Sequence, residues 1–515
     1  MEARFMKKRS RLILLILCAV LFFFIAPLAL FYSQGYRFDF DEKKFVETGG
    51  LYIKVSNTPA EIYLDGKFIR KTGLLSNSIL IKNLLPKKHN IEIKKEGFWS
   101  WQKTLEIEEK KVTKIENVLL IKKDISFKPL VAEDVEDFLV SQDGKKTLLR
   151  TEEENWSLEE LSLENGVKRK ILEGMEIIDW KWDSSKNRVL FQTNSGEKIA
   201  YFLLDYTPQI PILSELDFLD EETENISFNP KNDDEFFYLK NQIMFRAKFQ
   251  NPPTGGKNEP QAFLNNIVTF KILENDIIWL STSGFLFKSD YSGKTKEVLN
   301  QEPFFIQKEK KYKIETQGSE VFLLEAKRTS SSSSPSLSLR ESSEAKRISS
   351  SSSPSLSLRE SSVNDDIYYL SSNRVFQKIF DKAQGIKFSS DSKKAVYWNN
   401  YEIWILEFGI EYKKIFLTRF SKKIGDCFWL TPYYLIFNVE KEIKITEIDN
   451  RDKLNIVNLS SEKENNSNPV RGQEDLIKTQ SEQASNGAKI FYNEFNKKLY
   501  LLNQEKLFSS EPVIP

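Results

Sequence analysis

The hydrophobic pattern of the chain begins with one continuous apolar run, and everything after it alternates in short segments. The run, Leu12–Tyr32, covers 21 positions and is interrupted only by Pro27. At about 1.5 Å of rise per residue, a helix of this length crosses a hydrocarbon core of roughly 30 Å. Because lipid offers the backbone no hydrogen-bond partner, the segment is expected to be helical. The pattern predicts a transmembrane helix over residues 12–32.

The charges on either side of the run predict its orientation. Five cations and a single acid precede it, so residues 1–11 form a basic tail: Arg4, Lys7, Lys8, Arg9 and Arg11 against Glu2. Basic flanks stay cytoplasmic, which places the rest of the chain outside the cytoplasm. A cleaved signal peptide is the alternative, but the run is too long for one and has no Ala-x-Ala site. Residues 33–48 are interpreted as a linker.

Residues 49–124 alternate with the period of two that half-buried strands have. Six strands are expected, at 50–56, 61–64, 67–69, 78–81, 90–94 and 102–106. Asp65-Gly66 is a tight-turn signal between two of them, and Pro59 interrupts strand pairing because it lacks an N–H group. Regular short strands with turns between them predict a compact β-sandwich.

Residues 125–515 repeat a polar turn followed by an apolar strand. The turn centres Asp143, Asp183, Pro230 and Glu274 are 40, 47 and 44 residues apart, and Asp391 and Pro432 are 41 apart. An all-strand repeat of this length predicts the blades of a β-propeller, seven or eight in number. A strand near 125–131 is expected to close the ring, because closure removes exposed sheet edges.

Two polar segments interrupt this repeat. Residues 325–362 hold two nearly identical 19-residue copies rich in serine, which explains the 117-residue step between Glu274 and Asp391. Their composition predicts a disordered surface loop. A second polar loop is expected over residues 460–486.

Composition restricts the chemistry. Lys and Arg (75) balance Asp and Glu (74), which removes the electrostatic basis for nucleic-acid binding. His89 is the only histidine, so serine- and cysteine-hydrolase triads and histidine-rich metal sites are close to excluded. Cys18 lies within the predicted transmembrane helix and Cys427 lies far along the chain, so the two cysteines are not expected to form a disulfide. No catalytic, metal or cofactor residue and no small-molecule substrate is identified, so no cofactor is expected.

Two family resemblances follow from the motifs. The order Leu51-x-Ile53, Pro59-Ala60 and Ile62-Tyr63-Leu64-Asp65-Gly66-Lys67, with Leu84–Trp101 after it, resembles the PEGA domain. That resemblance implies an extracytoplasmic module beside a transmembrane helix, credited with binding envelope components and without catalytic residues. Its structural turn positions here are Pro59, Asp65, Gly66, Pro86 and Gly97, and His89 is interpreted as a strand-edge position. The Ser141–Lys145 turn and its relatives resemble TolB-like and WD40-like propellers.

The expected fold class is therefore all-β with one N-terminal transmembrane helix, a small β-sandwich and a seven- or eight-bladed β-propeller. The first functional hypothesis is a non-enzymatic bacterial envelope protein, anchored by a single pass and presenting propeller loops to a protein or glycan partner. Two alternatives stay open: a glycan-active enzyme that uses carboxylates in the propeller channel, and a purely structural spacer.

Overall fold

The computed structural model describes residues 8–73, 76–132, 134–152, 155–183, 188–194, 198–207, 211–232, 234–249, 259–327, 365–409, 411–459 and 488–514. The chain divides into two compact units. Unit 1 comprises residues 1–126, 445–459 and 513–515, and unit 2 comprises residues 127–444 and 460–512. The chain therefore leaves unit 2 at residue 445 and re-enters it after residue 459. Both predicted polar loops lie almost wholly outside the described residues.

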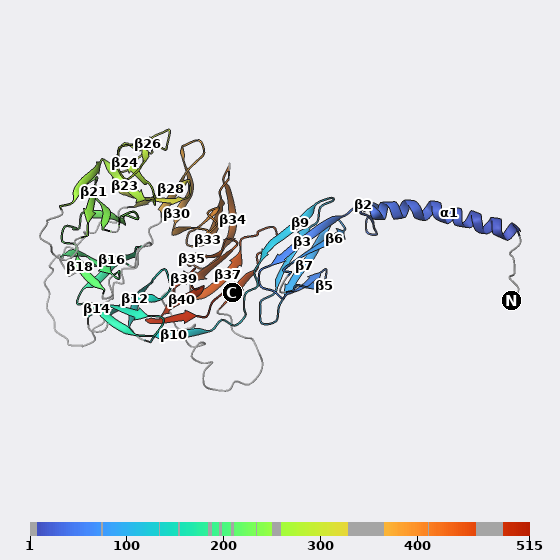
Figure 1. Ribbon diagram of the computed structural model, residues 1–515, viewed down its shortest axis with the longest axis horizontal. Helices are drawn as coiled ribbons and strands as arrows, with labels where there is room; N and C mark the ends of the chain where they lie inside the picture. Colours follow the sequence, from blue (N-terminus) through green and yellow to red (C-terminus); the bar gives the residue numbers. More distant parts are fainter. Residues whose placement is uncertain are drawn as a thin grey trace, which may run out of the picture. The chain divides into compact units, whose positions relative to one another are not determined.

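Unit 1 begins with the helix α1 (Lys8–Ser33), followed by short strands (Figure 1). Within it, Leu12–Ser33 is long and apolar enough to cross a membrane, and none of this span is buried in the protein. A hairpin of β1 (Tyr36–Asp39) and β2 (Lys44–Glu47) then occupies the segment where the sequence predicts a linker. The aromatic side chains of this hairpin are largely exposed, so its sequence lacks the alternating pattern that predicts a half-buried strand.

Two sheets complete the N-terminal part of unit 1. One has the order β6-β3-β9, from β3 (Gly49–Val55), β6 (Ser78–Leu84) and β9 (Val112–Val118). The other has the order β5-β4-β7-β8, from β4 (Glu61–Leu64), β5 (Lys67–Lys71), β7 (Lys88–Lys94) and β8 (Trp101–Glu106). Alternate side chains of both sheets share one core, including Ile53, Ile62 and Ile93. The sequence predicted six of these seven strands and missed β9.

The described residues from 127 onward form eight four-stranded antiparallel sheets. The first three in chain order are β11 (Val135–Val140), β12 (Lys146–Glu152), β13 (Trp156–Ser162), β14 (Lys168–Glu173); β15 (Glu176–Trp182), β16 (Arg188–Asn194), β17 (Ile199–Asp205), β18 (Ile212–Glu215); and β19 (Thr223–Phe228), β20 (Glu235–Lys240), β21 (Ile243–Lys248), β22 (Gln261–Asn265). The next two are β23 (Ile267–Ile272), β24 (Ile277–Ser281), β25 (Leu286–Ser289), β26 (Glu297–Val298); and β27 (Lys310–Gln317), β28 (Glu320–Lys327), β29 (Asp365–Leu370), β30 (Phe376–Ala383).

Three further sheets follow. They are β31 (Gly385–Phe388), β32 (Lys394–Trp398), β33 (Glu402–Glu407), β34 (Lys413–Arg419); β35 (Ile424–Thr431), β36 (Tyr434–Val439), β37 (Glu442–Glu447), β38 (Ile456–Asn458); and β39 (Lys489–Asn493), β40 (Lys498–Asn503), β41 (Lys506–Ser510) with β10 (Phe127–Val131). The last sheet is thus completed by a strand from the beginning of the repeat.

That strand closes a ring, as the sequence predicted. β10 pairs antiparallel with β41, and in Figure 1 the red strands of the last sheet lie beside the first teal strands. Side chains add to the closure, because Asn493 donates from Nδ2 to the Ser141 carbonyl oxygen at 3.0 Å. Successive four-stranded sheets closed in this way form a β-propeller.

The predicted turn centres are confirmed. Asp143, Asp183, Pro230, Glu274, Asp391 and Pro432 each lie between the first and second strands of a sheet. The apolar strand after each turn is the second strand, and β20, β24, β32 and β36 are buried along almost their whole length. Neighbouring sheets cover both faces of such a strand, which is why it reads as a continuous apolar run rather than an alternating one.

The clearest copies of the turn share one hydrogen-bond arrangement. Ser141 Oγ donates to Asp143 Oδ1 at 2.6 Å, and the Lys146 N–H donates back to Ser141 Oγ at 3.0 Å. Ser389 and Asp391 repeat both contacts, at 2.6 Å between Oγ and Oδ1 and 3.1 Å from the Lys394 N–H. The side chains thus satisfy turn groups that strand pairing leaves open.

Candidate functional site

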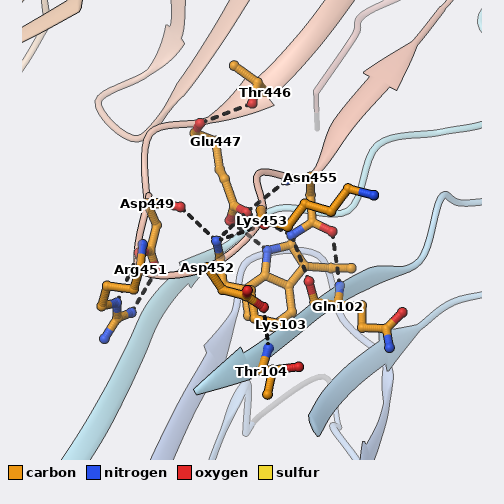
Figure 2. Close-up of polar contacts among 11 residues, drawn as sticks. Gln102, Lys103, Thr104, Thr446, Glu447, Asp449, Arg451, Asp452, Lys453 and Asn455 are labelled. Carbon is orange, nitrogen blue, oxygen red and sulfur yellow. Dashed lines mark hydrogen bonds and ion pairs between the residues drawn. The ribbon is translucent and has the colours of Figure 1, made fainter. Parts of the chain in front are cut away.

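The polar centre of unit 1 lies on the edge strand β8 and involves the segment Ile445–Leu459, which belongs to the same unit (Figure 2). Lys103 is completely buried, and its Nζ lies 2.9 Å from Glu447 Oε1. It also donates to the carbonyl oxygen of Asp449 at 2.7 Å. An ammonium group without solvent is stable only when charge and hydrogen bonds replace its water, and these contacts provide both.

Glu447 is held on its second oxygen as well. The indole Nε1 of Trp101 donates to Glu447 Oε2 at 2.7 Å, and Asn455 Nδ2 donates to Glu447 Oε1 at 2.7 Å. Trp101 therefore belongs to the apolar core through its ring and to this network through its nitrogen. We call Trp101, Lys103, Glu447 and Asn455 the edge network.

The same segment satisfies the free edge of the sheet. Asn455 accepts from the Gln102 N–H and donates to the Gln102 carbonyl oxygen, both at 3.1 Å. Asp452 Oδ2 accepts from the Thr104 N–H at 2.6 Å, which helps to keep the pKa of the Asp452 carboxyl below its usual value. Two side chains thus substitute for a further strand, and the edge is not available for pairing with another chain.

Asp449 is fixed beside this network. Burial alone would raise the pKa of its carboxyl, but the Arg451 guanidinium, bound at 2.9 and 2.7 Å, holds that pKa below its ordinary value. This pair orders the backbone whose carbonyl oxygen binds Lys103. The whole arrangement can hold the segment rigidly.

The turn positions predicted in the small β domain all lie in connections between strands. Asp65 and Gly66 join β4 to β5 with positive φ angles of 50° and 76°, the conformation of a two-residue hairpin turn. Gly97, with φ at 76°, lies between β7 and β8, and Pro86 lies between β6 and β7. Pro59 follows a cis peptide bond before β4.

His89 brings two of these turns together. It is buried, with Nδ1 2.7 Å from Asp65 Oδ2 and Nε2 2.9 Å from the Leu85 carbonyl oxygen. Both partners are hydrogen-bond acceptors, so each ring nitrogen faces an oxygen atom. Burial would raise the pKa of Asp65, yet the hydrogen bonds from His89 and from the Asn90 N–H lower it overall. His89 therefore lies at the beginning of β7 and bridges two turns.

Unit 2 gathers charges on its first strands, the strands by which neighbouring sheets meet. Glu315 on β27 lies 2.9 Å from both Lys271 Nζ and Lys313 Nζ. Burial, together with repulsion from Lys271 and Lys313, lowers the pKa of Lys181 on β15. Lys181, Lys271, Lys313, Glu315 and Asp179 form what we call the inner-strand cluster.

One carboxyl nearby has an unusual pKa. Burial raises the pKa of Asp365, at the start of β29, to about 6, against the opposing effect of Lys313. A carboxyl whose pKa is raised toward neutral pH is a property of general acids in glycosidases. Among the described residues, no group of three or more His, Cys, Asp and Glu side chains is arranged to hold a metal ion.

Comparison with known proteins adds little to these observations. No protein-family model matches the chain, so the PEGA resemblance stays a prediction, and no curated protein matches it either. Among solved structures, the Dos1 propeller is similar at 9% identity, with a TM-score of 0.46 over 75% of this chain and 94% of its own. The β-propeller domain of Myceliophteria thermophila Cps50 (Swd1) is 9% identical, with a TM-score of 0.38 over 75% of this chain and 99% of its own. Kluyveromyces lactis Hsv2 is 11% identical, with a TM-score of 0.34 over 64% of this chain and 98% of its own. At these TM-scores, the propeller assignment rests on the strand pairing and closure of this chain.

Proposed function

We propose that the chain is a single-pass membrane protein that holds a β-propeller outside the cytoplasm as an interaction scaffold. The observation that carries the proposal is the apolar span Leu12–Ser33, of which nothing is buried by the rest of the protein. About 22 exposed apolar residues are unstable in water, whereas a bilayer covers them completely. The basic residues before the span favour a cytoplasmic N-terminus.

In this proposal, the eight four-stranded sheets from residue 127 onward are an eight-bladed propeller, and the two sheets formed by β3 to β9 are a PEGA-like sandwich. The eight four-stranded sheets and the shared core of unit 1 support these assignments. A propeller that joins many loops to one rigid ring is suited to binding, and the partner is expected to be an envelope protein or a glycan. The inner-strand cluster, in which Lys271 and Lys313 flank Glu315, offers charged side chains to such a partner.

Topology is the decisive test. External protease is added to intact cells or spheroplasts that carry the full chain with a C-terminal tag. Loss of the tag, with a small N-terminal fragment protected, is the expected result. A tag that resists until the membrane is lysed would overturn the proposed orientation, and a mature chain that begins after residue 33 would identify a cleaved signal sequence instead.

Partner binding is tested with the full chain in detergent. A pull-down from envelope extract with the unaltered chain is compared with Lys271→Glu and with a matched surface change, Lys111→Glu. Reduced capture by Lys271→Glu alone would place the partner at the inner-strand cluster. Capture of nothing by any form of the chain would favour the spacer alternative.

A carboxylate-dependent glycan-active enzyme is the second candidate, and the raised pKa of Asp365 is the observation that favours it. Hydrolysis of envelope glycans by the unaltered chain, abolished in Asp365→Asn and retained in Asp124→Asn, would support this function. Equal release of products with and without the protein would contradict it.

A further inference from the structure

The hairpin that follows the helix exposes a group of aromatic rings. Phe38 on β1 and Phe45 on β2 are direct cross-strand partners, with ring centroids 5.2 Å apart. Phe40, at the turn, is 81% exposed, and its ring lies 5.2 Å from that of Phe38. We call residues 36–47 the aromatic hairpin. Large exposed aromatic groups on a soluble surface usually mark an interaction site.

The exposed rings continue the apolar surface of the helix without a break. Phe31, in the last part of α1, stacks on Phe45 with centroids 6.0 Å apart and meets Tyr36 edge-on at 5.5 Å. Phe31 is 46% exposed, and Tyr32 beside it is 64% exposed. Whatever covers the helix at this end therefore also reaches the rings of the hairpin.

Polar contacts close the base of the hairpin and attach its turn to unit 1. The Thr48 N–H donates to the Gly35 carbonyl oxygen at 3.1 Å, and Thr48 Oγ1 donates to the same oxygen at 2.6 Å. Lys87 Nζ lies 3.0 Å from Asp41 Oδ2, which ties the turn of the hairpin to the connection between β6 and β7. The hairpin is thus attached to unit 1 while its rings remain exposed.

Cations stand beside the rings where lipid headgroups would be. The Arg37 guanidinium lies 3.4 Å from the centroid of the Tyr32 ring and donates to the Tyr32 carbonyl oxygen at 2.9 Å. Lys43 is exposed in the turn, and Lys44, at the start of β2, is exposed with its Nζ 2.6 Å from Glu42 Oε2. Aromatic and basic side chains at the end of a transmembrane helix are the combination that anchors proteins at the membrane–water interface.

We propose that the aromatic hairpin is seated in the headgroup region of the membrane at the point where α1 emerges, with Phe38, Phe40 and Phe45 at the boundary with the acyl chains. This inference rests on the proposed membrane anchor. It adds a second contact with lipid, which holds the start of unit 1 against the bilayer instead of leaving it on a free tether.

The test uses the full chain with Cys18→Ser, so that one introduced cysteine carries a nitroxide label. Cys427 is buried and remains in place. Phe40→Cys is compared with Lys67→Cys, an exposed position on β5, after reconstitution into vesicles of phosphatidylcholine and phosphatidylglycerol. Collisions with oxygen, which concentrates in the bilayer, are measured against collisions with a water-soluble nickel chelate.

The expected result is that oxygen relaxes the label at position 40 more than the nickel chelate does, and that the order is reversed at position 67. A label at position 40 that collides mainly with nickel would overturn the proposal. Protection of position 40 from both reagents would also overturn it, because a protein surface, such as a second copy, would then cover the rings.

Flotation of the same samples with the vesicles separates the two proposals. If the chain floats while its label at position 40 stays in water, the membrane anchor is supported and the seated hairpin is contradicted. A chain that does not float contradicts the anchor itself. Because Phe40 is largely exposed, its replacement is not expected to disturb folding.

Discussion

At the scale of single residues, a buried charged side chain in unit 1 is stable only because a partner of opposite charge lies beside it. Lys103 has no exposed surface and reaches its carboxylate, Glu447, from a strand 344 positions away in sequence. Removing one member leaves the other charge buried without compensation, whereas removing both replaces the pair with apolar contacts. The edge network is therefore sensitive to single changes, and a matched double change removes only the charge penalty, because Trp101 Nε1 and Asn455 Nδ2 still lose their acceptor.

Glu447→Gln is expected to destabilise unit 1 locally by about 3–5 kcal/mol, because Lys103 keeps its charge and loses its counterion. Hydrogen exchange at the Gln102 and Thr104 amides reports the effect, and faster exchange is expected at both. Glu108→Gln, which removes an exposed ion pair with Lys111, is the control and is expected to change stability by about 0.5 kcal/mol or less. Equal exchange in both variants would contradict the role given to Glu447. Lys103→Met with Glu447→Leu is expected to recover only part of the loss, because Trp101 Nε1 and Asn455 Nδ2 remain without an acceptor.

Asp65 makes the stability of the small β domain dependent on pH. Its pKa is lower in the folded protein than the ordinary value of 3.8, so its contribution is complete above that value and is lost as the pH falls through the folded pKa. Asp65→Asn is expected to cost about 1–2 kcal/mol at pH 7, through weaker bonds to His89 and the Asn90 N–H. Hydrogen exchange in β4 and β7, followed from pH 7 to 3, is expected to show the difference disappearing in acid. A difference that persists unchanged at pH 3, or that Asp124→Asn reproduces, would refute the assignment.

At the scale of elements, the propeller sheets depend on the turn between their first and second strands. Ser389 and Asp391 satisfy the backbone of this turn, and Ser392 adopts a positive φ of 58° where the corresponding residue of the first copy is Gly144, at 68°. The two copies of the turn thus have the same backbone conformation at this position, with a glycine in one and a serine in the other. A glycine adopts this conformation without strain, whereas a serine does not.

Two substitutions in this turn are expected to act in opposite directions. Ser389→Ala is expected to destabilise by about 1–3 kcal/mol, because the Lys394 N–H and Asp391 lose a buried partner. Ser392→Gly is expected to stabilise by up to about 1 kcal/mol by removing a left-handed serine. Chemical denaturation followed by hydrogen exchange in β31 and β32 measures both. A loss of stability in Ser392→Gly would show that its side-chain contact with Gln317 outweighs the backbone strain.

At the scale of the whole molecule, closure makes distant parts of the chain depend on each other. Asn493 is buried and donates to Ser141 and Gln142, while its Oδ1 accepts from the Phe495 N–H at 2.9 Å. Together with the pairing of β10 and β41, these contacts join the first and last sheets of the ring, between residues more than 350 positions apart in the sequence. A closed ring has no terminal sheet at which unfolding can begin.

Asn493→Ala is expected to destabilise by on the order of 2 kcal/mol and to act on both sides of the closure. Hydrogen exchange is expected to rise in β11 and β12 as well as in β39 and β40, because the lost bonds join the two sheets. Asn503→Ala, at the end of β40, serves as the control in the same sheet. Faster exchange confined to β39 and β40 would contradict a coupled closure.

The sequence by itself determined the features that depend on neighbouring residues. The apolar length of residues 12–32, the period-two strands of residues 49–124 and the turns centred on Asp143 and Asp391 are local signals, and the helix, the strands and the turns follow them. Local signals suffice there because capping, turn geometry and burial act within a few residues.

Only the tertiary structure decided which distant groups meet. Lys103 and Glu447 each look like ordinary charged surface residues, and nothing in their neighbourhoods indicates that burial pairs them. The sequence around His89 did not indicate that its side chain bridges two turns. The aromatic hairpin was not predicted, because its exposed rings do not give the alternating pattern of a half-buried strand. The physical reason is the same in each case: long-range contacts are selected by the packing of the complete fold, where a buried charge or polar atom is stable only beside the partner that the fold brings to it.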